Sequence, residues 1–174
     1  TEIIIQKTTD VYQKLQAYEV RILALIGQNK LIEAVKTGIE ILNEMGAKLP
    51  DKPGKINNSL GQFEIKMALS GRKIHDLVAL PRMEDPQSLA QIKIMSTIIW
   101  AVYSSAPELF PAIVFRMISL SLKHGNANES SLGYACYGLY LCGVTGDIST
   151  GYEFGQLALD LIEKLNAKEF AAKT

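Results

Sequence analysis

The segment EILNEMGAK, residues Glu40 to Lys48, is echoed by DLIEKLNAK at Asp160 to Lys168, and SLSLKHGNA at Ser119 to Ala127 aligns with both. In each segment an apolar helical stretch ends at Gly or Asn, the residues that most readily adopt the left-handed conformation after a helix. The segments are spaced by roughly one or two multiples of forty residues, the length of a two-helix solenoid repeat. The echo therefore predicts helical hairpins that bury their apolar faces by stacking on one another.

The rest of the chain supports an all-α fold, because apolar residues recur at helical spacing and no segment shows a sustained alternation with a period of two. We expect hairpins at about residues 9–46, 58–80, 86–125 and 130–166. The second of these is the most irregular. Together they predict a single helical-repeat-like domain of stacked antiparallel hairpins over residues 1–174.

Several helix ends carry recognisable signals. Asp85 followed by Pro86 is a strong start, because Asp accepts from free backbone N–H groups and Pro fits the first turn. Gly27 is placed to end the first helix in the left-handed conformation, and Ser105 with Glu108 has capping-box spacing. Gly125 is expected to need a positive φ, so that Gly125→Val would destabilise the fold.

Composition is that of an ordinary globular protein, with 48% hydrophobic and 21% charged residues among 174. Lys plus Arg equals Asp plus Glu at 18 each, with the two signs interspersed, so we expect no nucleic-acid partner. The longest uncharged run, Ser130 to Gly146, is shorter than the ~20 residues of a membrane span and predicts a buried helix rather than membrane insertion.

The two cysteines, Cys136 and Cys142, are predicted to lie on nearly opposite faces of one helix as reduced core residues. Reduced cysteines and the lack of a signal peptide at the start of this sequence predict a cytoplasmic location. The first residues, Thr1 and Glu2, and the abrupt end at Thr174 suggest a fragment of a longer protein.

Three stretches resemble a known family: LPRMEDP at Leu80 to Pro86, SLSLKHGNANESSLGYACYG at Ser119 to Gly138, and VTGDISTGYEFGQLALDLIEKL at Val144 to Leu165. They look like the tetratricopeptide-like helical region of large bacterial signalling proteins that join a serine/threonine kinase, a P-loop ATPase, this region, a GAF sensor and a histidine kinase. ILNEMGAKLP, at Ile41 to Pro50, is similar to the hairpin that follows the ATPase. The resemblance implies a divergent tetratricopeptide-like right-handed superhelix between the ATPase and the sensor.

Catalytic motifs are missing from the sequence. It has no Gly-rich phosphate loop with its Lys and Ser/Thr and no kinase Lys, Asp and Asp-Phe-Gly set. Two His and two Cys residues match no zinc spacing. We therefore expect no catalytic residue, cofactor or metal in this chain, whereas the resemblance implies that the parent protein is a kinase.

The candidate interaction or ligand surface consists of His124, Asn126, Ser130, Tyr134, Tyr137 and Tyr152. The first three cluster around one interhelical turn, and the tyrosines belong to the C-terminal hairpin. A structural alternative exists for each group. The polar residues can cap helices, and the rings can pack between them.

Two functions are compatible with these features. The first is a non-catalytic interaction or relay module, whose partners are other domains of the same polypeptide or a regulatory protein. The alternative is a small-molecule sensor with a pocket near the C-terminal hairpins. An open concave surface would favour the module, and a closed pocket with converging polar groups would favour the sensor.

Overall fold

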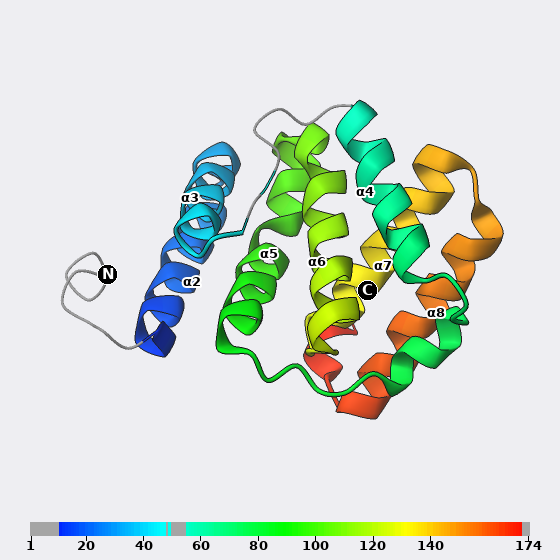
Figure 1. The fold of residues 1–174 in the computed structure, drawn as a ribbon. Coiled ribbons are helices and arrows are strands. Elements are labelled where there is room, and N and C mark those ends of the chain that lie inside the picture. The colour runs from blue at the N-terminus through cyan, green and yellow to red at the C-terminus, as the bar shows by residue number, and fades with distance from the viewer. Residues whose placement is uncertain (1–10, 48, 50–54, 172–174) are drawn as a thin grey trace.

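The computed structural model describes residues 11–47, 49 and 55–171 of the chain (Figure 1). Every regular element in that part is helical, and the β-type pairing found there is an isolated bridge between Arg82 and Asn126. The predicted all-α class is thereby confirmed.

The first hairpin is formed by α2 (Val11–Gly27) and α3 (Leu31–Glu44), which pack against each other. Gly27 does not end α2 in the left-handed conformation, as the sequence had suggested. Asn29 does so instead, with φ 58°, and Lys30 N–H closes the turn on the Leu25 carbonyl at 2.9 Å. The turn is therefore two residues later than the glycine predicts.

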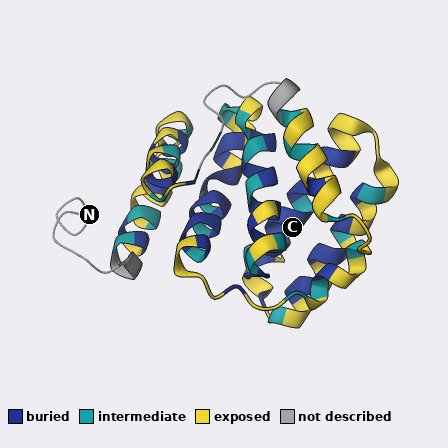
Figure 2. Ribbon diagram, in the orientation of Figure 1, coloured by how far each residue is buried: buried dark blue, intermediate teal, exposed yellow. Residues whose placement is uncertain are grey.

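The central hairpin pairs α5 (Pro86–Ser105) with α6 (Phe110–His124), after the short 3₁₀ helix η2 (Pro107–Leu109). Asp85 caps α5 as predicted, accepting from Ser88 N–H at 2.8 Å. The capping box expected at Ser105 is wrong, because its hydroxyl donates back to the Ala101 carbonyl at 2.8 Å. Because α5 is apolar on most sides, it is buried along most of its length between the neighbouring helices (Figure 2).

The last hairpin consists of α7 (Ser130–Tyr140), its π-helical extension η3 (Leu141–Thr145) and α8 (Ile148–Leu165), followed by η4 (Lys168–Phe170). Glycines let its two helices approach backbone to backbone, since a Cβ on Gly138 would lie 2.7 Å from the Gly151 carbonyl oxygen. Asp147 begins α8 by accepting from Thr150 N–H at 3.2 Å. This hairpin packs on the central one through α6 and α7.

The hairpin predicted at residues 58–80 is wrong. The helix α4 (Lys55–Ala68) packs on α6, whereas the 3₁₀ helix η1 (Ile74–Ala79) packs on α8. Lys164 of α8 donates a hydrogen bond from Nζ to the Val78 carbonyl of η1 at 2.6 Å. From α4 the chain passes close to α8 and returns along the bottom of Figure 1 to α5. We call residues 69–85 the crossing segment. Its helix, η1, has six residues and does not form a hairpin with α4. The side chain of Leu77 in η1 is buried.

The three echoed segments all end a helix with a positive-φ residue: Gly46 at 72°, Gly125 at 94° and Asn166 at 52°. The first and third close identically. Ala47 N–H donates to Leu42 at 2.8 Å, and Ala167 N–H donates to Ile162 at 3.0 Å. In the middle copy the equivalent N–H, that of Asn126, instead donates to Pro81 of the crossing segment at 2.7 Å. The N–H group after Gly125 therefore bonds to the crossing segment instead of to the preceding turn of its own helix.

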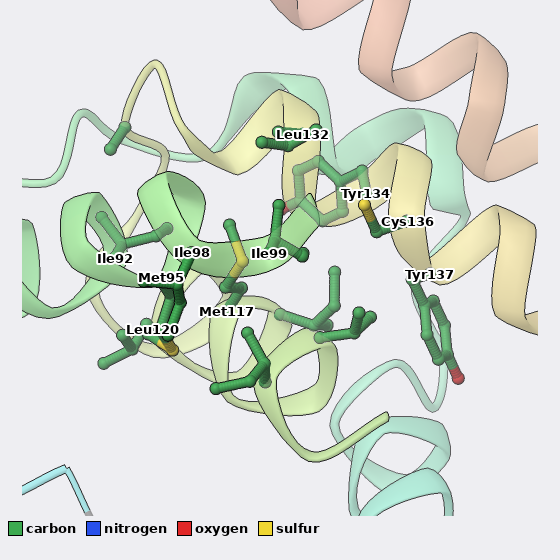
Figure 3. Close-up of a cluster of buried hydrophobic side chains, with 14 of the residues drawn as sticks. Ile92, Met95, Ile98, Ile99, Met117, Leu120, Leu132, Tyr134, Cys136 and Tyr137 are labelled. Atoms are coloured by element: carbon green, nitrogen blue, oxygen red, sulfur yellow. The ribbon is translucent and has the colours of Figure 1, made fainter. Parts of the chain in front are cut away.

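The core lies where α5, α6 and α7 meet. Figure 3 shows isoleucines and methionines of α5 and α6 against the first turns of α7, with Ile92, Met95, Ile98, Ile99, Met117 and Leu132 fully buried. It continues outward to α8 through Phe154 and Leu161. The hairpins thus share one apolar interior instead of having separate cores.

Gly125→Ala should lower the free energy of unfolding by about 3 kcal/mol or more. Gly125 has φ 94° and ψ −179°, a region that is open almost only to glycine, and a Cβ there would lie 2.3 Å from the Pro81 carbonyl oxygen. Urea unfolding followed by circular dichroism measures the change.

Gly71→Ala is the matched control, because Gly71 also has a positive φ, 75°, but nothing lies within 4 Å of its Cβ position. It should cost only about 1 kcal/mol. Equal losses in the two variants would contradict the close contact with the crossing segment.

Candidate functional site

Three of the predicted site residues, Asn126, Ser130 and Tyr134, come together and are buried. Tyr134 donates its hydroxyl proton to Asn126 Oδ1 at 2.9 Å, and Asn126 Nδ2 donates to the Leu77 carbonyl at 2.8 Å. Ser130 Oγ accepts from Ala127 N–H at 2.9 Å. These residues form an internal hydrogen-bond network beneath the crossing segment, so the prediction that they form a surface is wrong.

A buried serine pair extends the network into α6. Ser121 Oγ and Ser130 Oγ are 2.7 Å apart, and Ser121 Oγ is also 3.0 Å from the Met117 carbonyl oxygen. Burial raises the pKa of the Tyr134 hydroxyl far above its usual range. The phenol therefore remains protonated and serves as a hydrogen-bond donor.

His124 lies half-buried in the last turn of α6, where a cation complements the helix dipole. It is close enough to Asp85 to contribute to the lowered pKa of that carboxyl, which is held down mainly by its hydrogen bonds with Ser88. His124 therefore lies at the edge of the buried network, where its position fits the structural alternative.

Tyr137 belongs to an aromatic cluster instead of a binding surface. Its ring packs edge-on against Phe154 at 4.8 Å between centroids and against Phe115 at 6.0 Å, and it stacks with Tyr140 at 6.3 Å. Burial raises the pKa of Tyr137 to about 12. The ring-packing alternative is the correct one for this residue.

Of the predicted tyrosines, Tyr152 alone is exposed, with 66% of its surface accessible. It borders a shallow hollow of about 390 Å³ on the outer side of the last hairpin. The described residues that line this hollow carry no charge: Ala135, Gly138, Leu139, Cys142, Ile148, Gly151, Tyr152, Gly155, Gln156 and Leu159. We call this surface the outer face.

The cysteines differ from the prediction that both are core residues. Cys136 is buried in α7, and burial raises the pKa of its thiol to about 12. Cys142 lies in the π-helical turn η3, is exposed and lines the outer face. The widened π turn shifts the register after Tyr140, which spacing on one regular helix does not anticipate.

A second groove, which the sequence did not reveal, lies between α4 and α6. It has a volume of about 680 Å³ and opens to solvent. Its charged lining residues are Glu64, Arg72, Arg116 and Lys123, and its apolar lining includes Leu49, Leu60, Ile65, Phe115 and Leu122. These residues come from sequence positions that no short motif connects.

No metal-binding arrangement is found among the described residues. No group of three or more His, Cys, Asp or Glu side chains there could hold a metal ion. His75 is exposed on η1. In the same part of the chain, no helix combines the length and the apolar character needed to cross a bilayer.

Comparison with protein-family models, curated proteins and solved structures gives no match to this chain. Function is therefore inferred from the buried network and from the open surfaces of the described chain. The network is structural. The outer face and the α4–α6 groove are open surfaces at which another molecule could bind.

Asn126→Asp should destabilise the fold by about 3 kcal/mol at neutral pH. The substitution replaces the donor that faces the Leu77 carbonyl with an oxygen in a buried site. Burial should raise the pKa of the new carboxyl, and its protonated form can donate to Leu77. The loss should therefore shrink as the pH falls from 7 toward 5, because the folded state then binds a proton more tightly than the unfolded state.

Chemical denaturation of Asn126→Asp at several pH values measures this effect. Asn43→Asp, at an exposed position of α3, supplies the control and should show neither the loss nor the pH dependence. A loss for Asn126→Asp that is small and independent of pH would argue against the buried hydrogen bond to Leu77.

Iodoacetamide should modify Cys142 and leave Cys136 unmodified in the folded protein. Cys142 is exposed, whereas Cys136 is buried and its raised pKa suppresses the reactive thiolate. Mass spectrometry after a short reaction should find a single modification, lost in Cys142→Ser. Both thiols should react in urea. Rapid modification of Cys136 without denaturant would contradict the burial of this residue in α7.

Proposed function

We propose that this chain is a non-catalytic interaction module that binds another protein through the outer face of its last hairpin. The observation that carries the proposal is the exposed apolar surface there. Four large apolar side chains that line its hollow, on α7 and α8, are exposed to solvent: Leu139, Ile148, Tyr152 and Leu159. Contiguous apolar surface with polar surroundings is typical of protein-binding sites.

The chemistry of the outer face favours the apolar face of an amphipathic helix as the partner. Its hollow has no charged residue among the described lining residues, and nothing lies within 4 Å of the Cβ position of Gly155, which leaves room for a backbone to come close. Within the chain, hairpins already pack in this way, since α7 lies on α6. An amphipathic helix on the outer face would continue the same packing.

The wider context of the proposal comes from the sequence resemblance. It supports a divergent tetratricopeptide-like right-handed superhelix, in the cytoplasm, between the ATPase and sensor domains of a multidomain serine/threonine and histidine kinase. In that setting the module would relay conformational state by rigid-body packing, and its partner would be another domain of the same polypeptide or a regulatory protein.

A selection of displayed helical peptides against the folded protein tests the proposal. The enriched peptides should carry apolar residues at positions i, i+3, i+4 and i+7. Tyr152→Asp and Leu159→Asp should each weaken their binding by about tenfold or more, because a charge would be buried in an apolar interface.

Ile32→Asp is the matched control. Ile32 is equally exposed and apolar, but it belongs to α3 in the first hairpin. Its substitution should leave binding of the enriched peptides unchanged. The proposal fails if the peptides lack a helical apolar pattern, or if they bind both outer-face variants as tightly as the unmodified protein.

A further inference from the structure

The groove between α4 and α6 combines an apolar floor with fixed positive charge. Both helices run from top to bottom in Figure 1, and α4 rests on α6 where Gly61 meets the ring of Phe115. A Cβ on Gly61 would lie 2.5 Å from Phe115 Cδ2. Both residues line a space of about 680 Å³ between the two helices. That volume is in the range of small-molecule sites.

The side chain of Arg116 is held in place by a hydrogen bond to Gln91 of α5. Its Nη2 donates to Gln91 Oε1 at 2.9 Å, and Gln91 is itself buried and oriented by donating through Nε2 to the Met45 carbonyl at 2.8 Å. The amide of Gln91 therefore presents its oxygen to the guanidinium. An arginine that is fixed before a ligand arrives loses little conformational entropy on binding.

The guanidinium has hydrogen-bonding capacity left. Its Nε is buried and makes no hydrogen bond within the described structure. Gln91 is a neutral partner, and no carboxylate among the described residues forms an ion pair with Arg116, Arg72 or Lys123. The described lining thus has three cations against a single acid, Glu64. This imbalance fits an anionic ligand.

We propose that the α4–α6 groove binds a small amphiphilic carboxylate. The apolar body of the ligand lies against Phe115, Ile65 and Leu60, and its carboxylate accepts hydrogen bonds from Arg116, with Arg72 and Lys123 adding attraction. Guanidinium and carboxylate match in geometry and charge. This site lies on other elements than the outer face, so it does not rest on the function proposed above.

Decanoate, used below its micelle concentration, is the probe. Isothermal titration calorimetry should detect saturable binding, and the melting temperature should rise with decanoate concentration. Decanol and decyltrimethylammonium have the same chain without the negative charge. They should bind at least about tenfold more weakly, because the charge-assisted hydrogen bonds are lost.

Arg116→Gln should weaken decanoate binding about tenfold or more. Lys36→Gln is the matched control, since Lys36 is an exposed cation that borders a different shallow apolar groove, on α3. It should bind decanoate as the unmodified protein does. Ala68→Phe should abolish binding by filling the groove without changing its charge.

The proposal is overturned if decanoate does not bind, if decyltrimethylammonium binds as tightly, or if Ala68→Phe leaves the affinity unchanged. Circular dichroism verifies the fold of each variant. If Arg116→Gln fails to fold because Gln91 loses its partner, Ala68→Phe and Lys123→Gln decide. Full affinity in both would place decanoate elsewhere and reject the groove as its site.

Discussion

The architecture depends on Asn126, a buried residue whose two main-chain and two side-chain polar groups are all hydrogen-bonded. Its N–H donates to Pro81, its carbonyl accepts from Met83 N–H, its amide donates to Leu77, and its amide oxygen accepts from Tyr134. Because a buried polar group without a partner is costly, each of these bonds fixes the position of its counterpart. One residue thereby holds the crossing segment, the turn after α6 and the helix α7 in register.

The same residue explains how a repeated sequence gives an unrepeated structure. The echoed segments place alanines, Ala47 and Ala167, where the middle copy has Asn126. Both alanines are buried, and their N–H groups close the helix that precedes them. The asparagine side chain adds two hydrogen bonds that alanine cannot make, one to the Leu77 carbonyl and one from the Tyr134 hydroxyl. With Asn in place of Ala, the end of α6 can therefore bind the crossing segment through a side chain.

Much of the fold could be predicted because its signals are local. Helical periodicity, the cap at Asp85 and the helix ends at Gly46, Gly125 and Asn166 all act within a few residues. The crossing segment could not be predicted. Its burial of Leu77 and its bonds to Asn126 depend on partners about fifty residues away, which no local pattern encodes.

The candidate site shows the same division. The sequence correctly grouped Asn126, Ser130 and Tyr134, because they lie within a few residues on one turn and helix, but it could not show that the crossing segment covers them. Tyr137 and Tyr152 look alike in sequence. The first faces Phe154 and the second faces solvent, and only the way α7 and α8 pack separates them. The α4–α6 groove was missed for the same reason.

The path of the crossing segment also affects how the protein unfolds. In a linear array of repeats each unit touches only its neighbours, so a terminal unit can fray while the others remain folded. Here η1 is anchored on α8, Lys164 reaches the carbonyl of Val78, and the following residues are tied to the turn before α7. The last hairpin cannot detach without freeing the segment that leads into the central helix α5. We therefore expect the last hairpin and the central hairpin to unfold together, as one cooperative unit.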